Sequence, residues 1–481
     1  MGQEKRGHKQ QIYFEGGDTH KLIIGATRSG KSRCIVLPSI GLQALAGESM
    51  IASDPKGELY QYTYPFLERL GYEVVALDFK NPLKSSRYNF LQNVIDAINE
   101  GNNPKAIDSA WDMTQALVPE AKNSEPIWTN GEAAVIAACI LAVVYDNQNY
   151  PEYQNLTNVY YFLANMCKPV KKDIPMNTYM KQLPDDHPAK ALMGIAEVAP
   201  EKTRSSFFTS ALTTLRLFTS PLIYTMTSEC DFDINDTTRK RAIFIILPDE
   251  KTTYYSLASL FVNQYYEVLV HNADDRGGRL ERRVHFNLDE FGNFTKIPSF
   301  STKLTVGGGR GCLFSLYLQS LAQLDDVYGR EISKTIQGNC QTWLYLQADD
   351  METLETISKK LGNYTVMAGS QSSSSGQSSS TSASYSLMSR ALLTVDEVKL
   401  ISRPYTLVTS RSHPAMMKAP DIAQTPFNAM FGLGDPEHNR RLREERENRR
   451  EVRTASDMKL WGIWKEYDGS IANATSHLQR R

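Results

Sequence analysis

The sequence lacks several features that would place it in a simple structural class. Its six cysteines show no CxxC spacing and no paired framework, so we expect reduced cytosolic thiols rather than zinc ligands or disulfides. The longest apolar stretch, Ala133 to Tyr145, has 13 residues, which is too short to cross a bilayer and indicates a buried helix. No signal peptide is recognisable.

An excess of charge of either sign is also missing. The 481 residues include 53 Lys and Arg against 54 Asp and Glu, a net charge of −1. Nucleic acid would therefore have to bind through a local surface, such as a pore lining, rather than through overall attraction. The length allows two to four domains.

A complete GxxxxGK[ST] loop is the clearest feature that is present. It follows the apolar run Leu22–Ile24, as a P-loop follows its strand. The two glycines let backbone N–H groups surround a β-phosphate, Lys31 reaches the β- and γ-oxygens, and the Ser32 hydroxyl can bind Mg²⁺. A helix that starts here would add its positive N-terminal end. The predicted nucleotide-binding loop comprises Gly25, Ala26, Thr27, Arg28, Ser29, Gly30, Lys31 and Ser32.

The carboxylates that hydrolysis requires are predicted at the end of a second strand, Val284–Leu288. Asp289 would hold Mg²⁺ through water, and Glu290 would orient and polarise the attacking water. His285 and Asn287 interrupt the apolar pattern of this strand, which indicates that one of its faces meets polar groups.

A third candidate position lies after the strand Ser49–Ser53. Asp54 and Lys56 occupy its carboxyl end, where ligands bind in open α/β sheets. An ordinary turn with a surface ion pair explains these residues equally well, so both interpretations stay open.

The order of predicted elements indicates an α/β fold with an all-helical insertion. Strand patterns occur near both ends of the chain, and helical periodicity replaces them from about residue 93 to residue 218. The predicted strands are Leu22–Ile24, Ser49–Ser53, Val74–Asp78, Ala242–Leu247, Val284–Leu288, Cys312–Leu318, Gln341–Leu346 and Tyr405–Thr409. The predicted helices of the insertion include Pro104–Leu117, Trp128–Tyr145, Asn158–Asn165 and Thr203–Phe218.

Two segments have unusual composition. Gly369 to Ser386 is mostly serine, which predicts a structureless loop, either a solvated excursion between two sheet elements or a mobile loop that touches a substrate or a pore. Beyond Leu433 the chain is dense in arginine and glutamate, which predicts a solvated helix of mixed charge rather than a DNA-binding arm.

Five segments, in this order and spacing, resemble the TraG/TraD coupling proteins of bacterial type IV secretion and conjugation. The likeness extends from about His20 to Ser410. The segments read GATRSGKS from residue 25, SDPKGEL from 53, LDEFGNF from 288, GRGCLFSLYLQSLAQLDDVYG from 309 and LLTVDEV from 392.

The resemblance implies a RecA-like P-loop NTPase with a doubly wound, mainly parallel sheet and an inserted all-α domain. It implies roles for Lys31 and Ser32 on phosphate and Mg²⁺, and for Asp289 and Glu290 on metal and water. Gln319 resembles a polar sensor that faces the γ-phosphate; capping of its own strand is the alternative. Arg310 resembles an arginine that reaches a neighbouring subunit's nucleotide, with a flexible-loop position as the alternative. The implied domains are 1–95, 96–225 (all-α), 226–432 and a charged tail, 433–481.

The implied activity is the ATP-driven delivery of relaxase-bound single-stranded DNA, and sometimes of proteins, to a secretion channel. ATP and Mg²⁺ are the implied cofactors. Relaxase, relaxosome accessory proteins, channel ATPases and membrane components are the implied partners of a ring, usually a hexamer, at the cytoplasmic face of the membrane. Family members normally carry transmembrane helices ahead of the P-loop, and this sequence has none, so its anchor was removed or it docks on a membrane partner.

Two other functions fit parts of the sequence. An FtsK/SpoIIIE-like translocase acts on double-stranded DNA, but its winged-helix module would need more apolar residues than the tail contains. A substrate receptor whose nucleotide site serves only assembly would not turn over ATP. Within the helical region, Trp111, Trp128, Tyr160 and Tyr161 could stack on bases, although core packing is the commoner role of such residues.

Overall fold

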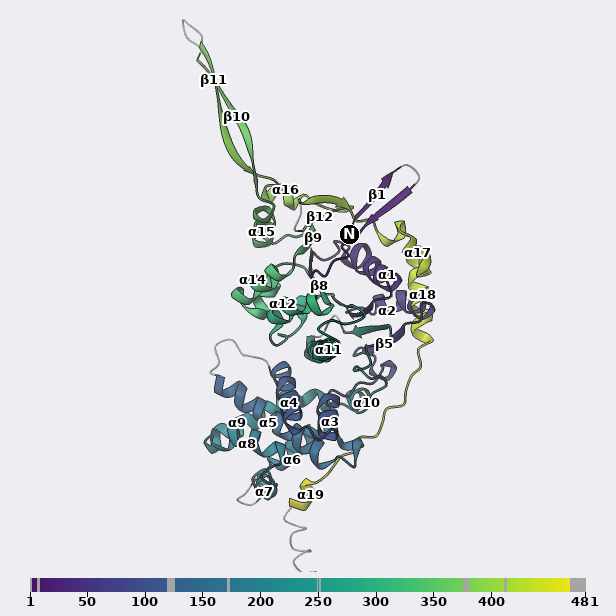
Figure 1. Cartoon of the computed structure of the whole chain (residues 1–481), viewed down its shortest axis with the longest axis vertical. Coiled ribbons are helices and arrows are strands. Elements are labelled where there is room, and N and C mark those ends of the chain that lie inside the picture. The colour runs from purple at the N-terminus through teal and green to yellow at the C-terminus, as the bar shows by residue number, and fades with distance from the viewer. Residues whose placement is uncertain are drawn as a thin grey trace, which may run out of the picture.

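A computed structural model places an eleven-stranded sheet at the centre of the molecule (Figure 1). It describes residues 2–6, 9–118, 126–170, 174–248, 250, 252–374, 380–410 and 413–467. The strand order is β2-β1-β13-β12-β9-β3-β8-β7-β4-β6-β5, and the seven strands from β9 to β5 are parallel. The strands are β1 (Gly2–Arg6), β2 (Lys9–Tyr13), β3 (Lys21–Gly25), β4 (Ser49–Asp54), β5 (Glu73–Asp78), β6 (Arg241–Ile246), β7 (Val284–Leu288), β8 (Cys312–Leu318), β9 (Thr342–Gln347), β12 (Tyr405–Thr409) and β13 (Ala415–Lys418).

All eight predicted strands lie in this sheet, and the prediction of a mainly parallel, doubly wound sheet is confirmed. The antiparallel edge formed by β13, β1 and β2 was not predicted, because these short strands alternate polar and apolar residues too weakly to stand out.

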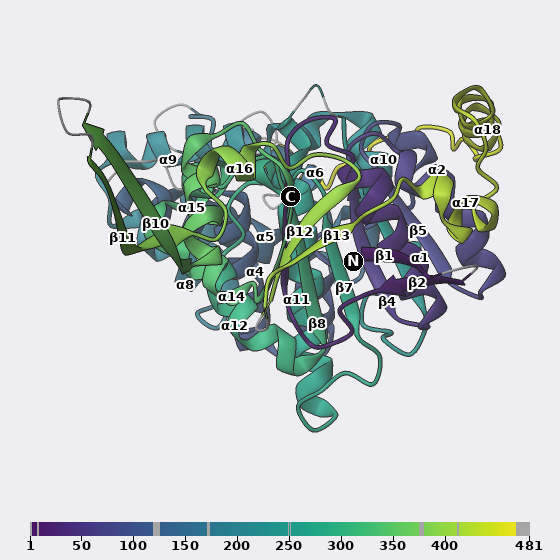
Figure 2. The same cartoon turned by 90° about the horizontal axis from the view of Figure 1, so that it is seen from above.

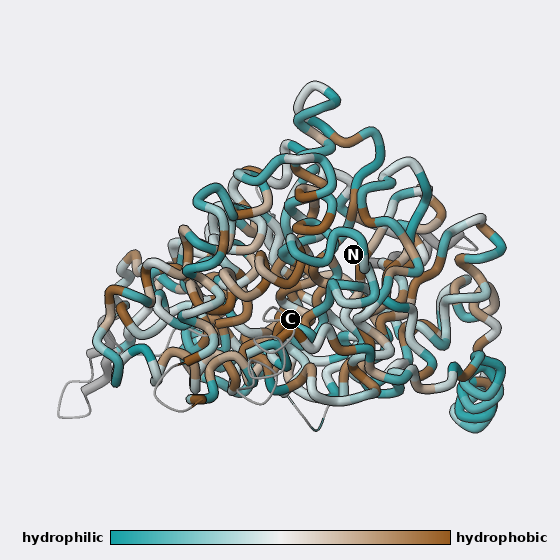
Figure 3. Tube along the Cα trace, turned by 90° about the horizontal axis from the view of Figure 1, so that it is seen from below, coloured by the Kyte–Doolittle hydropathy of each residue, from teal (hydrophilic) through white to brown (hydrophobic). Residues whose placement is uncertain are grey.

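Helices cover both faces of the sheet (Figure 2). One face packs against the helix after the P-loop, α1 and α2, with α17 and α18 further out; the other packs against α11 and α12. Apolar residues are concentrated between these layers, in the interior of the molecule (Figure 3). The helices of this part are α1 (Leu37–Leu45), α2 (Glu58–Arg69), α11 (Tyr255–Asp275), α12 (Phe300–Arg310), α13 (Ala322–Tyr328), α14 (Arg330–Asn339), α15 (Met351–Leu361), α16 (Val395–Lys399), α17 (Pro426–Met430) and α18 (Pro436–Asn448).

The polar face that was predicted for β7 exists. Asn287 and Gln43 of α1 exchange two side-chain hydrogen bonds, of 2.8 and 3.3 Å, and His285 pairs with the carboxylate of Glu48. These partners allow polar side chains to lie in a central, buried strand, because each buried amide is satisfied.

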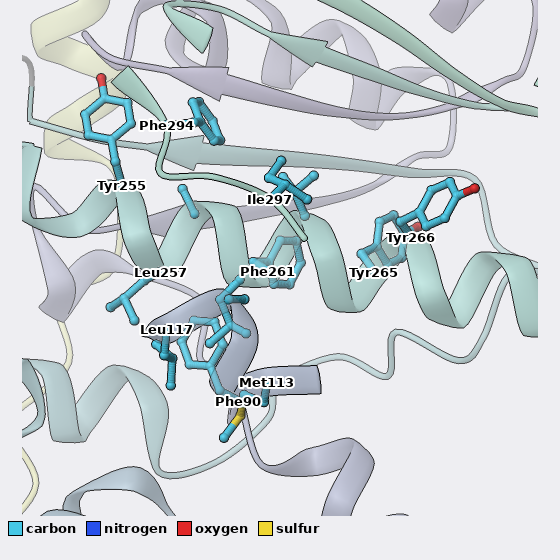
Figure 4. Close-up of a cluster of buried hydrophobic side chains, with 14 of the residues drawn as sticks. Phe90, Met113, Leu117, Tyr255, Leu257, Phe261, Tyr265, Tyr266, Phe294 and Ile297 are labelled. Atoms are coloured by element: carbon cyan, nitrogen blue, oxygen red, sulfur yellow. The ribbon is translucent and has the colours of Figure 1, made fainter. Parts of the chain in front are cut away.

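A helical block separates β5 from β6, and Figure 1 shows it as a layer beyond α11. Its core joins that of the sheet where α11 meets α4, through Phe261, Met113 and Leu117 (Figure 4). Trp111 and Tyr160 pack against this core, whereas Trp128 stays 44% exposed. The helices of the block are α3 (Gln92–Asn99), α4 (Asn103–Leu117), α5 (Pro126–Asp146), α6 (Leu156–Met166), α7 (Pro175–Gln182), α8 (Pro188–Glu197), α9 (Glu201–Thr214) and α10 (Pro221–Thr227).

Helix α5 corrects one prediction and confirms another. It has 21 residues, so it is long and apolar enough to cross a membrane, contrary to the length argument from sequence. It is also the buried helix that was predicted: from Ala133 to Val144 every side chain is buried. It is the only described helix with this combination of length and apolar composition, and the core helix of a soluble protein can have both.

The charged C-terminal segment is helical as predicted, but it is not simply solvated. Arg446 of α18 is buried and donates hydrogen bonds to the backbone carbonyls of Gln61, Tyr62 and Phe431. Beyond α18, the chain runs in an extended form to the helical block and continues to α19 (Trp464–Tyr467). Trp461 stacks on a ring of α6 there, so the segment connects the two parts of the molecule.

Most of the serine-rich segment is not a structureless loop; its residues 375–379 lie outside the part of the chain that the structure describes. Strands β10 (Asn363–Ser374) and β11 (Ser380–Ala391) pair in an antiparallel hairpin, which projects from the body (Figures 1 and 2). Composition misled the prediction because serine has a weak strand preference, and here the continuous backbone ladder outweighs it.

Replacing residues 369–386 with a short glycine linker should leave the melting temperature nearly unchanged. The described side chains of this stretch are exposed, so little apolar burial is lost. Differential scanning calorimetry of the wild type and the shortened chain measures the effect. A loss of more than about 2 °C, equivalent to roughly 2 kcal/mol in a protein of this size, would contradict the expectation.

Stability should depend on pH through His20, which precedes β3. Its Nδ1 accepts from the backbone N–H of Phe314 and its Nε2–H donates to the carbonyl of Leu304, so the neutral imidazole fits; burial lowers its pKa to about 4. Between pH 6.5 and pH 4 the imidazole is therefore protonated in the unfolded chain but not in the folded one. Because protonation favours the unfolded chain, stability falls as the pH falls through this range.

Between pH 7 and pH 5, His20 should lower the free energy of unfolding by about 2 kcal/mol. Urea unfolding of the wild type and of His20→Gln at both pH values isolates this contribution, because the other titrating groups are shared. An equal pH dependence in the two proteins would refute it.

Candidate nucleotide site

The P-loop connects β3 to a helix that begins at Lys31, as predicted. Gly30 has φ +95°, a left-handed conformation that favours glycine, and a Cβ there would meet the Arg403 guanidinium. A Cβ on Gly25 would lie 2.5 Å from the Ser29 hydroxyl oxygen. A side chain is therefore disfavoured at Gly30 by the backbone conformation and at Gly25 by lack of space.

The first helical turns after the loop are π-helical, over Lys31–Val36, before α1 continues as an α-helix. Pro38 lies just inside α1, and a proline lacks the N–H of an α-helical bond and clashes with the carbonyl four residues earlier. The wider π turn relieves this clash, and such turns recur at functional sites.

Four side chains from the P-loop and from the end of β7 converge. The Ser32 hydroxyl donates to the Oδ2 of Asp289 at 3.3 Å, and the ammonium of Lys31 lies 3.6 Å from the Oε1 of Glu290. Lys31 also donates to the carbonyl of Gly25 at 2.6 Å. The structure therefore brings together the two motifs that the sequence placed 257 residues apart.

A polar chain links Glu290 back to the P-loop. Gln319, at the end of β8, donates from Nε2 to the Oε2 of Glu290 at 2.9 Å, and its Oε1 accepts from the Thr27 hydroxyl at 3.3 Å. The Gln319 side chain thus connects both motifs instead of capping its own strand. Glu290 has φ +50°, an uncommon backbone conformation for a residue with a side chain, of the kind that clusters at active sites.

Burial shifts the titration of two carboxyl groups at this edge. Burial raises the pKa of Asp289 to about 6. The neighbouring Glu290 carboxylate adds to this increase, and the charge of Lys31 opposes it. The pKa of Asp54 is raised to about 7, again mainly by burial. A divalent cation near these oxygens would favour their ionised forms.

Asp54 does not form the surface ion pair that sequence left as an alternative. Its side chain is 1% exposed, and its Oδ2 accepts from the backbone N–H of Tyr60 at 2.8 Å, in the first turn of α2. The neighbouring Ser53 hydroxyl donates to the carbonyl of Asp289. Asp54 therefore fixes α2 beside the strand end that carries Asp289, while Lys56 is exposed.

Arg310 lies away from the P-loop of its own chain. It ends α12 just before β8, whereas Gln319 follows β8, and the seven residues of a strand span about 23 Å. Its guanidinium pairs with Asp274 at 3.0 Å. The flexible-loop alternative is wrong, since Arg310 is the last residue of a helix; the predicted contact with a neighbour's nucleotide stays a prediction.

Arg403 contacts the P-loop and was not predicted. Its Nε donates to the carbonyl of Ser29 at 2.7 Å and its Nη2 to that of Arg28 at 3.0 Å. It belongs to the segment before β12, 374 residues away from Ser29, and carries no motif by which sequence could have revealed it.

The residues present suit a nucleoside triphosphate with Mg²⁺. The buried Ser29 hydroxyl oxygen has no hydrogen-bond partner among the described residues, as expected for a group that faces a ligand. Ser32 and Asp289 could supply hard oxygen ligands to the metal, and Lys31 could supply a cation for the phosphate oxygens. Among the described residues no group of three His, Cys, Asp or Glu is placed to hold a metal ion.

Comparison with known proteins agrees with this geometry. The family described as type IV secretory system conjugative DNA transfer matches residues 2–419. The chain belongs to this family. Protein VirD4 of Agrobacterium fabrum is 25% identical over 413 residues, which cover 83% of this chain and 58% of VirD4. The conjugal transfer protein TraG of Rhizobium radiobacter is 22% identical, over 84% of this chain and 62% of TraG. The family member described here thus spans about three-fifths of the length of these relatives.

The solved structures of the bacterial conjugative coupling protein TrwB share the fold. An unbound form matches with a TM-score of 0.61 at 18% identity, covering 85% of this chain and 87% of that chain. A form of TrwB with an ATP analogue and one with ADP and Mg²⁺ match with TM-scores of 0.61 and 0.60, at 16% and 17% identity. The RecA-like P-loop NTPase fold that sequence predicted is therefore confirmed.

Proposed function

We propose that this chain is an ATP-hydrolysing coupling protein, which delivers single-stranded DNA to a type IV secretion channel during conjugation. The observation that carries the hydrolytic part is the contact of Glu290 with both Lys31 and Gln319, beside the Ser32–Asp289 pair. A site that only bound nucleotide would need the P-loop but not a second carboxylate poised next to it.

Each side chain has a distinct task in the proposed mechanism. ATP with Mg²⁺ supplies the cleavable phosphoanhydride and the metal charge when bound. Lys31 would leave the Gly25 carbonyl and bind phosphate oxygens, while Ser32 and Asp289 hold the metal position. Glu290 would take the proton of the attacking water, and Gln319 would hold the Glu290 carboxylate in place.

The names of the relatives support the DNA-transfer part. VirD4 and TraG are proteins of secretion and conjugal transfer, and TrwB is a conjugative coupling protein with nucleotide complexes. We propose ATP and Mg²⁺ as cofactors, and the relaxosome and the secretion channel as partners. We also propose a homo-hexamer at the cytoplasmic face of the membrane. The helical block is proposed as the inserted domain, 96–225.

Single-stranded DNA should raise the ATP turnover of the purified chain severalfold, because a strand inside a ring holds neighbouring subunits together. Phosphate release with no DNA, with single strands and with duplexes of equal length measures this. A larger effect of duplex DNA would favour an FtsK/SpoIIIE-like translocase. No turnover under any condition, with ATP binding retained, would favour a receptor and overturn the proposal.

A further inference from the structure

Among the described residues, no strand pairs with either outer edge of the β10–β11 hairpin. Its twelve residue pairs form a two-stranded sheet separate from the central one, and Figure 1 shows it standing clear of the body. Twelve residues of strand extend about 40 Å. An isolated two-stranded hairpin is marginally stable in water at best, so this one needs additional contacts to be stable.

One face of the hairpin carries a strip of large exposed apolar side chains. The register places Met367 opposite Leu387, and Gly369 opposite Tyr385 on the same face. Met367, Tyr385 and Leu387 are 70%, 71% and 77% exposed. The Tyr385 ring lies over Gly369, and a Cβ there would be 3.1 Å from it, so the strip is continuous across both strands.

The composition of the hairpin argues against a charged partner. From Asn363 to Ser389 the sequence contains no Asp, Glu, Lys, Arg, His or Pro. Binding to nucleic acid depends on cations that meet phosphates, so this surface is unsuited to DNA. Exposed edge strands are normally protected from pairing by lysine or proline, and this hairpin has neither protection over that range.

Both outer edges of the hairpin present backbone N–H and C=O groups that another strand could pair with. At the hairpin base the N–H of Leu392 donates to the carbonyl of Gly362, so every second pair from there is hydrogen-bonded within the hairpin. Thr365 and Ser389 fall between these pairs, and their N–H and C=O groups therefore point to the outer edges. Two hairpins that point in the same direction bring β11 of one beside β10 of the other in antiparallel orientation.

We propose that the β10–β11 hairpins of neighbouring copies of this chain pair edge to edge, β11 of one copy with β10 of the next. We choose a second copy of the hairpin as the partner because its strands are uncharged and proline-free over the same range, are equal in length and have matching polarity. The contact is head-to-tail, so repetition closes a ring when the rotation permits. Pairing of successive hairpins also gathers the strips of Met367, Tyr385 and Leu387 into one apolar surface.

Disulfide trapping between two single-cysteine chains tests the pairing directly. Thr365→Cys is made in one chain and Ser389→Cys in another; both positions are exposed, and neither chain can form the bond within itself. Paired residues of adjacent strands have Cα atoms about 5.5 Å apart, which suits a disulfide. The oxidised mixture should yield a covalent dimer that neither chain alone, nor the wild type with its six native cysteines, yields.

Charged substitutions test whether the same surface drives assembly. Met367→Lys with Leu387→Lys should weaken association in sedimentation velocity by at least about tenfold, because charges are forced together in the gathered strip. Met351→Lys, at a position on α15 that is 56% exposed, is the matched control and should associate as the wild type does. Melting curves of all three establish that folding is intact.

Three results would overturn the proposal: no interchain disulfide above the wild-type background, association that the double variant does not weaken, or a wild type that stays monomeric at every concentration. Binding of a monomeric wild type to phosphatidylcholine vesicles, lost in the double variant, would assign the strip to lipid instead. Because these assays use no ATP and no DNA, their outcome is independent of the proposed transport activity.

Discussion

Glu290→Gln should lower ATP turnover by about 10³-fold while ATP binding stays near the wild-type level. The substitution keeps the shape of the side chain, and its amide oxygen can still accept from Gln319, but it cannot take a proton from water. Phosphate release and equilibrium binding of a fluorescent ATP analogue separate the two effects. Lys31→Ala should lose both, because the phosphates lose their nearest cation.

Glu281→Gln provides the matched control for this experiment. Glu281 is 85% exposed and pairs only loosely, at 3.9 Å, with Arg276 before β7, so the same chemical change there should leave turnover unchanged. Near wild-type hydrolysis by Glu290→Gln would show that another group activates the water, and the assignment of the second carboxylate would be wrong.

Chains with Arg310→Ala should be inactive alone and regain activity when mixed with Lys31→Ala chains. Arg310 lies at the opposite end of β8 from Gln319 and so away from its own nucleotide site, which leaves the predicted contact with a neighbour's nucleotide as the role to test. In a mixed ring, a Lys31→Ala chain offers an intact Arg310 to the intact P-loop of an Arg310→Ala chain, which restores one working site. Turnover of the mixture over a range of ratios measures this recovery.

Two controls make the mixing experiment decisive. Arg276→Ala, at a surface position near the end of α11, should keep wild-type turnover, which shows that loss of an arginine there is harmless in itself. Cross-linking of differently tagged chains must show that mixed rings form. With mixed rings present, absence of recovery would refute a role of Arg310 in a neighbour's site.

Local patterns predicted the elements well because their causes are local. Apolar runs of strand length predicted the seven parallel strands and the neighbouring β12. The P-loop motif predicted a tight turn followed by a helix, and Gly30 has the left-handed conformation of such a turn. The apolar pattern of β7, broken by His285 and Asn287, predicted polar neighbours, and Glu48 and Gln43 are those neighbours.

Composition alone failed where long-range contacts decide. The serine-rich segment forms the β10–β11 ladder, which depends on pairing of residues up to 28 apart in sequence. The arginine-rich tail contributes the buried pair of Arg450 with Asp78, at 2.5 Å, which no helical pattern could indicate. In both cases the partner lies outside the window from which a propensity is read.

The sequence by itself determined the strand and helix order, the phosphate loop and the two carboxylates at the end of β7, because these follow from periodicity and from motif chemistry. Only the tertiary structure decided that Gln319 joins Glu290 to Thr27, and that Arg403 holds the carbonyls of the loop. The residues that these contacts connect are between 29 and 375 positions apart in the sequence. The contacts form only once the sheet has assembled and its strand ends meet at one edge.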